Sequence, residues 1–82
     1  MGEVAITFKI MPKSVDIDIY KIKEEISKKI KIHDYHIEDI AFGLKVLRIL
    51  VVSPDGATEK IENEIKSVEG VSEVEVESST LI

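Results

Sequence analysis

The sequence predicts an α+β fold in which two helices cover one face of a four-stranded antiparallel sheet. Four segments have the apolar patterns of β-strands, and two others have apolar residues at helical spacing. Their order along the chain is β-α-β-β-α-β. Because each helix is apolar on one side only, both need a sheet face to cover, and right-handed crossovers place them on the same face. The 82 residues suffice for one domain, predicted to span 1–82.

The first half of this pattern begins with a strand over residues 3–11, in which apolar side chains alternate with others. Pro12 ends the strand, because proline has no N–H to donate to a neighbouring strand. A helix follows to about residue 31, with Asp16 or Asp18 capping its first turn. The buried strand face and the buried helix stripe are expected to consist of Val4, Ile6, Phe8 and Ile10, and of Ile19, Ile22, Ile26 and Ile30.

The second half begins with an edge strand over 33–41, whose broken alternation indicates a bulge. Residues 44–52 are nearly all apolar, which is typical of a central strand. A second helix is predicted over 57–68 and ends before Gly70. The last strand starts at Val71 and alternates with glutamates, which predicts an edge position. With the first and third strands the most apolar, the sheet is expected to have the ferredoxin-like order 4-1-3-2.

The sheet face away from the helices is the first candidate surface. In the third strand, one set of alternate residues contains the mid-strand charge Arg48, so this set is predicted to point outward. Its other members, Leu44, Val46 and Leu50, would then form an exposed apolar patch, and such patches mark partner surfaces. The alternative is that a second copy or long side chains from neighbouring strands cover the patch.

Composition excludes several classes of protein. The net charge of −5 disfavours nucleic acid as a direct partner, since phosphate contacts need clustered Lys and Arg. There are no cysteines, hence no disulfide or thiolate metal site. No apolar run approaches the length of a membrane span, and the N-terminus lacks the pattern of a signal peptide. We therefore expect a cytoplasmic protein with no membrane contact.

The sequence contains no convincing set of catalytic groups. His33 and His36 have H-x-x-H spacing, but in a loop this indicates solvated histidines rather than a metal site. The glutamates of the last strand, 73, 75 and 77, fit a solvated edge. Arg48 is the one arginine and lies in mid-strand, whereas a hydrolase of this fold would need an anion-binding arginine in a loop. We expect no cofactor, no metal and no enzymatic activity.

The turn before the central strand is the remaining candidate. Glycine at 43 permits a positive φ, which suits a tight turn between two strands. That turn would present Phe42 at one end of the sheet, where the ring either packs into the core or forms part of a contact surface.

Residues 40–47 (IAFGLKVL) resemble the GFGIKKL segment of the elongation factor 1-beta exchange domain family. The Ile10-Met11-Pro12 segment resembles the VKP element of that family. The chain length, the Met1-Gly2-Glu3-Val4 start and the Val68-Glu69-Gly70-Val71 helix end are similar to the short archaeal form. The resemblance covers essentially the whole chain. It implies that this chain is a guanine-nucleotide exchange factor for the GTPase elongation factor 1-alpha. Such a factor would disturb the Mg²⁺ and phosphate site of the GTPase.

The resemblance also implies which residues contact the GTPase. In eukaryotic relatives, the phenylalanine matching Phe42 lies in the contact surface, and a C-terminal segment with a penultimate lysine reaches the Mg²⁺ region. This chain instead ends in Leu81-Ile82, without a lysine. The candidate contact residues are Phe42, Gly43, Leu44, Lys45, Val46, Arg48, Leu81 and Ile82.

The alternative function is a small ligand-sensing or assembly module of the same fold, because the Val68–Val74 segment is also similar to ACT-like domains. A module of that kind is expected to have a glycine in the loop after the first strand. The Met11–Ser14 segment has none.

Overall fold

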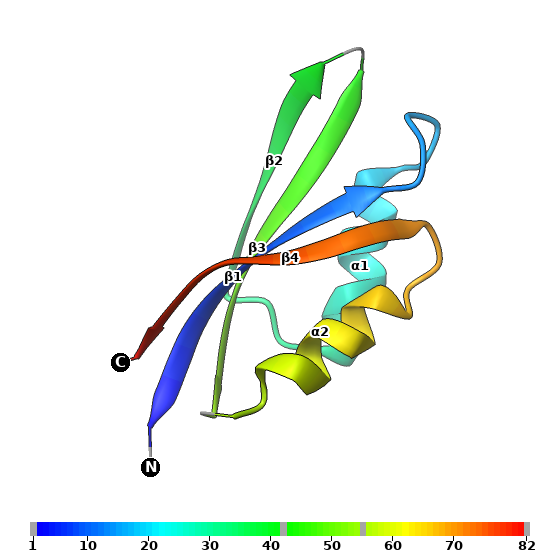
Figure 1. Ribbon diagram of the computed structural model, residues 1–82. Coiled ribbons are helices and arrows are strands. Elements are labelled where there is room, and N and C mark those ends of the chain that lie inside the picture. The colour runs from blue at the N-terminus through cyan, green and yellow to red at the C-terminus, as the bar shows by residue number, and fades with distance from the viewer. Residues whose placement is uncertain (1, 42, 55, 82) are drawn as a thin grey trace.

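The computed structural model describes residues 2–41, 43–54 and 56–81. For Ala41 alone, it describes the backbone but not the side chain. The predicted order of elements is confirmed, and the sheet order β2-β3-β1-β4 is the predicted order read from the other edge. All neighbouring strands are antiparallel, and both helices lie on one face of the sheet (Figure 1). The elements are β1 (Glu3–Pro12), α1 (Ile19–Lys29), β2 (Asp34–Ala41), β3 (Leu44–Pro54), α2 (Thr58–Lys66) and β4 (Val71–Leu81).

The core lies between the helices and the two central strands, as the patterns predicted. Phe8 of β1 is fully buried at its centre. Each contributing element places residues of one face there, at period two in the strands and at helical spacing in the helices. The members are Val4, Ile6, Phe8 and Ile10 of β1, Leu47, Ile49 and Val51 of β3, Ile19, Ile22 and Ile26 of α1, Ile61 and Ile65 of α2, and Val68, Val71 and Val74 beyond it.

Local side-chain and backbone chemistry sets the ends of α1. Of the two predicted caps, Asp18 is the one used, and its Oδ1 accepts a hydrogen bond from the Tyr20 N–H at 3.0 Å. The helix ends at Lys29, slightly earlier than predicted, because Ile30 already has extended backbone angles. The loop before α1 is joined to the turn after α2, where the Lys13 N–H donates to the Gly70 carbonyl at 2.9 Å.

Both edge strands carry the irregularities that edges commonly show. In β2 the register with β3 shifts between Asp39 and Ala41, which confirms the predicted bulge. In β4 the register with β1 shifts so that Glu77 lies between two paired residues, Val76 and Ser78. Bulges re-aim side chains, and this one determines where Glu77 points. No helix among the described residues is long and apolar enough to cross a membrane.

Candidate functional site

The β2–β3 turn stands at one end of the sheet (Figure 1). Gly43 has φ +79°, which confirms the predicted positive φ, and a Cβ added there would meet no atom within 4 Å. The backbone therefore requires glycine or a strained alternative, while space is open around it. Phe42 lies outside the described residues, so the orientation of its ring stays a prediction from the sequence.

Lys45 is exposed near this turn, opposite Asp39 of β2. It belongs to the same alternate set as the buried Leu47, but it lies near the end of the hairpin, beyond the core. A hollow of about 110 Å³ joins this part of the hairpin to the loop between β1 and α1. Its lining consists of Pro12, Ser14, Val15, Ile17, Asp18, Ile19, Tyr20, Gly43 and Lys45.

The prediction of an exposed apolar patch on the open sheet face is wrong. Val46 has 0% exposure, and Leu44 and Leu50 are half-buried. The outward direction of this set is confirmed, since Val46 lies outside the core under the helices, yet the face is covered. Val46 is buried within the single chain, where Glu38 is its cross-strand neighbour, so of the two predicted alternatives no second copy is needed to cover it.

Arg48 ties both edges of the sheet together across this open face. Its Nε lies 2.7 Å from Glu77 Oε1 of β4, and its Nη1 lies 2.9 Å from Glu38 Oε2 of β2. Glu38 is also the cross-strand neighbour of Val46. Hydrogen bonds raise the pKa of the Arg48 guanidinium above its ordinary value, the one to Glu77 having the larger effect and the one to Glu38 the smaller. The sequence did not indicate these two glutamates as partners, because they lie far from Arg48 along the chain.

Leu81 lies at the opposite end of the sheet from the β2–β3 turn. It is exposed and pairs with Val4, whereas the far end of β1 pairs Ile10 with Leu47. From Val4 to Ile10 a strand advances about 20 Å at roughly 3.3 Å per residue, and Gly43 lies further still. The structure therefore divides the candidate contact residues into two groups. Ile82 lies outside the described residues.

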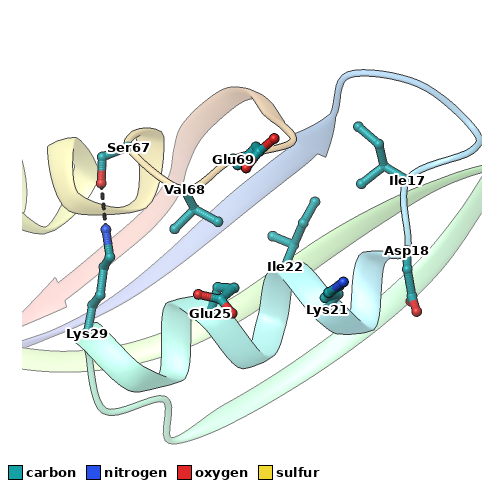
Figure 2. Close-up of a pocket in the computed structure, with 9 residues that line it drawn as sticks. All are labelled: Ile17, Asp18, Lys21, Ile22, Glu25, Lys29, Ser67, Val68 and Glu69. Carbon is teal, nitrogen blue, oxygen red and sulfur yellow. Dashed lines mark hydrogen bonds between the residues drawn. The ribbon is translucent and has the colours of Figure 1, made fainter.

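The helices present a groove between them, shown in Figure 2. The groove, of about 500 Å³, is lined by charged side chains of both signs above Ile22 and Val68. Lys29 Nζ donates to Ser67 Oγ across it at 2.9 Å, which ties α1 to the end of α2. This mixture of charges selects no particular ligand.

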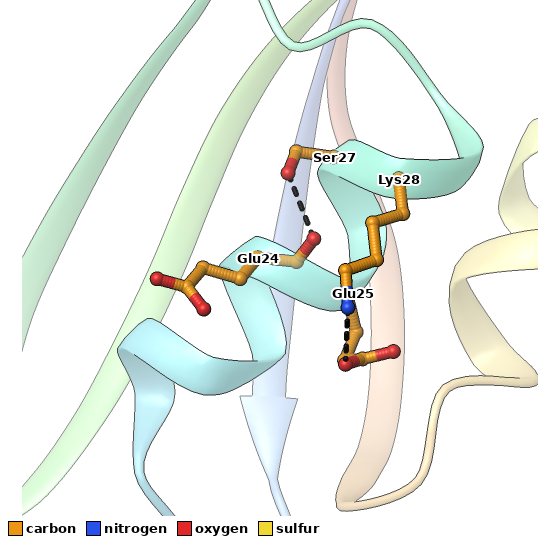
Figure 3. Close-up of polar contacts among 4 residues, drawn as sticks. All are labelled: Glu24, Glu25, Ser27 and Lys28. Atoms are coloured by element: carbon orange, nitrogen blue, oxygen red, sulfur yellow. Dashed lines mark hydrogen bonds and ion pairs between the residues drawn. The ribbon is translucent and has the colours of Figure 1, made fainter.

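Other polar groups have ordinary structural partners. On the outside of α1, Ser27 Oγ donates to the Glu24 carbonyl at 2.7 Å and Lys28 Nζ pairs with Glu25 Oε1 at 3.3 Å (Figure 3). Such pairs between residues of one helix surface stabilise it only slightly. His33 uses its backbone N–H to bond the Leu50 carbonyl. Within the described ranges, no three His, Asp or Glu side chains form a group that could hold a metal.

The fold is that of a small ferredoxin-like domain, with the β2–β3 turn and Leu81 at opposite ends of its sheet. A family model described as the EF-1 guanine nucleotide exchange domain matches residues 5–82. "Elongation factor 1-beta" of Staphylothermus marinus is 44% identical over 95% of this chain and 94% of its own length. The protein of that name from Methanothermobacter thermautotrophicus is 43% identical over 93% of this chain and 92% of its own length. The one from Thermoplasma acidophilum is 39% identical over 100% of both chains. The chain belongs to the EF-1 guanine nucleotide exchange domain family, which confirms the resemblance seen in residues 40–47.

Proposed function

We propose that this chain promotes release of GDP from the GTPase elongation factor 1-alpha by binding the GTPase and disturbing its Mg²⁺ and phosphate site. The observation that carries the proposal is the family match over residues 5–82. The resemblance of residues 40–47 to the family segment supports it, because Gly43 of that segment lies in the turn between β2 and β3. The family match also favours exchange over the ligand-sensing alternative.

Exchange needs no acid, base or metal on the factor. A protein that binds the nucleotide-free GTPase more tightly than the GDP-bound form must weaken GDP by the same ratio, because coupling between two ligands is reciprocal. A thousandfold loosening requires about 4 kcal/mol of differential affinity. A few well-packed contact residues supply that order of free energy.

The two groups of candidate residues suit contact with two separate regions of the GTPase. The Gly43 and Lys45 group lies at one end of the sheet and Leu81 at the other. Contact at the Leu81 end would displace the loops that hold the ion, since such loops depend on the ion and phosphate for their order.

Charge favours this partner class. The chain carries a net charge of −5, and a GTPase that delivers tRNA presents a basic surface. Opposite charges accelerate encounter more than they raise affinity. We therefore expect the association rate to fall as salt rises, while the dissociation rate changes less.

The decisive experiment follows the release of fluorescent GDP from the cognate GTPase, with and without this chain. We expect acceleration at about micromolar factor, a concentration typical of protein pairs of moderate affinity. Chelation of Mg²⁺ by EDTA serves as the positive control for release. If EDTA releases the nucleotide and this chain leaves the rate unchanged, the proposed function is wrong.

A further inference from the structure

The loop between β1 and α1 lies beside the β2–β3 turn, although the two are about thirty residues apart in sequence. Both project at the same end of the molecule in Figure 1. They share the hollow of about 110 Å³, to which the loop and the start of α1 contribute Val15 and Tyr20 and the hairpin contributes Gly43 and Lys45. A partner side chain that enters this hollow from Gly43 and Lys45 would also contact Val15 and Tyr20. We call these four residues the tip surface.

The tip surface exposes apolar side chains to an unusual degree. Val15 is 55% and Tyr20 54% exposed, the largest values among the described apolar side chains after Leu81. Ile40, near the same end of β2, is also exposed. In a chain with so small a core, exposed apolar groups that gather at one place indicate a binding surface, whereas isolated ones do not.

The backbone that carries Val15 and Tyr20 is held in place before any partner binds. The Lys13 N–H bonds the Gly70 carbonyl at 2.9 Å, and the Ile17 N–H bonds the Ser14 carbonyl at 3.3 Å. Asp18 caps α1 through the N–H of Tyr20. A fixed loop loses little conformational entropy on binding, so more of its contact energy appears as affinity.

We propose that Val15 and Tyr20 anchor the GTPase beside Gly43 and Lys45. This inference rests on the proposed exchange function and adds a second chain segment to its contact surface. The hollow is small and open, and its lining includes Ser14, Asp18 and Lys45 beside the apolar groups, so it suits one short side chain of the GTPase. Lys45 at its edge favours a carboxylate next to that side chain.

An anchoring role differs from a role in nucleotide release. Val15 and Tyr20 lie at the end of the sheet away from Leu81, and we assign to them contacts made equally with the GDP-bound and the nucleotide-free GTPase. Such uniform binding sets how much factor is needed, but it does not set the rate at saturation. Their loss therefore raises the half-saturating concentration of factor and leaves the saturated rate of GDP release unchanged.

The test compares Val15→Ala and Tyr20→Ala with two matched controls, Val76→Ala and Tyr35→Ala. The controls remove the same side chains at comparable exposure, 40% and 44%, away from the tip surface. We expect each tip variant to raise the dissociation constant for the nucleotide-free GTPase and the half-saturating concentration at least about fivefold. Both controls stay within about twofold of the wild type, the usual range for surface changes outside an interface.

Three results are possible, and each decides the inference. The inference is supported if only the tip variants lose affinity for the GTPase fivefold or more, while their saturated rate of GDP release and their circular dichroism stay unchanged. If the wild-type chain accelerates GDP release and the Val15→Ala/Tyr20→Ala double variant binds equally well, the anchoring inference alone is overturned. If the wild-type chain neither binds the GTPase nor accelerates release, the proposed function fails and the inference fails with it.

Discussion

At the scale of single residues, Phe42 is the side chain from which we expect the largest effect on exchange. It lies in the sequence segment 40–47 that resembles the family motif, precedes a glycine with open space around it, and is an aromatic of the kind that dominates interface energies. Phe42→Ala should reduce GDP release at limiting factor at least about tenfold. The measurement is the fluorescent-GDP assay, with a thermal unfolding scan of the same sample.

Phe42→Leu is the matched control, because it keeps apolar volume and removes only the ring. We expect it to retain an intermediate activity. Two outcomes would contradict a contact role for Phe42. One is unchanged exchange in Phe42→Ala, and the other is loss of folding in that variant, which would place the ring in the core.

Gly70 gives a second prediction at this scale, on stability. Its φ of +96° is strained for any other residue, and a Cβ added there would lie 3.3 Å from Ile17 Cγ2. Gly43 also has a positive φ, but its added Cβ meets nothing. Gly43→Ala should therefore lower the free energy of unfolding by about 1 kcal/mol, the cost of the left-handed backbone alone. Gly70→Ala should lower it by about 2 kcal/mol or more, because steric crowding adds to that cost.

Urea unfolding measures both changes. Equal losses in the two variants would show that Ile17 moves aside freely, and that the contact with it has no energetic weight. A larger loss in Gly43→Ala would contradict the account of Gly70 altogether.

At the scale of elements, periodicity predicted strands, helices and the faces that they bury, because each of these depends on residues close together in sequence. The two faces of β3 are an example, since Leu47, Ile49 and Val51 do lie under the helices. The same pattern failed for Val46. Alternation predicts toward which side a residue points, but it does not predict which side chains cover the residue there. The glutamates that bond Arg48 on this face come from both edge strands.

The candidate site shows the same limit. The sequence motif identified the turn at Gly43, yet it gave no sign that Val15 and Tyr20 line the same hollow. They follow β1 and precede α1, and only the crossing of the chain over the sheet brings them beside the hairpin. Leu81 shows the converse, because the family resemblance placed it with Lys45 among the candidate contact residues, whereas the strand pairing places it at the far end of the sheet.

The two ion pairs of Arg48, with Glu38 and Glu77, form what we call the Arg48 bridge, and they give the prediction at the scale of elements. Arg48→Lys keeps the charge but loses the planar fork that reaches two carboxylates, so it should lower the urea midpoint of unfolding. Arg48→Ala should lower it more, because it also removes the stem beside Val46. Because its carboxylate partners raise the pKa of Arg48, its guanidinium stays charged at every pH below the ordinary arginine value and loses its charge only in stronger alkali.

Salt is therefore the better probe of the bridge. In about 1 M NaCl the Debye length falls to roughly 3 Å, and the difference between wild type and Arg48→Lys should shrink. Glu38→Gln and Glu77→Gln test the two halves separately. If Arg48→Lys unfolds at the wild-type midpoint in low salt, the guanidinium fork adds nothing to stability beyond its charge.

At the scale of the whole molecule, the fold makes a long domain with a candidate contact group at each end. Its principal extents are 42, 20 and 17 Å, and the long strands run toward both ends. A continuous antiparallel sheet joins the Lys45 end to the Leu81 end. Such a body can hold two regions of a partner at a fixed separation, since its strands do not bend independently.

This geometry predicts that the two ends act independently. We expect Lys45→Ala to raise the half-saturating concentration of factor and Leu81→Ala to lower the saturated rate of GDP release. Sites more than about 10 Å apart without shared partners combine additively in free energy. The loss in exchange efficiency of the double variant should therefore equal the product of the single losses, within about twofold. Leu81 is exposed, so its replacement should leave the fold unchanged. A double variant no worse than the poorer single variant would contradict independence and indicate that both ends serve one step.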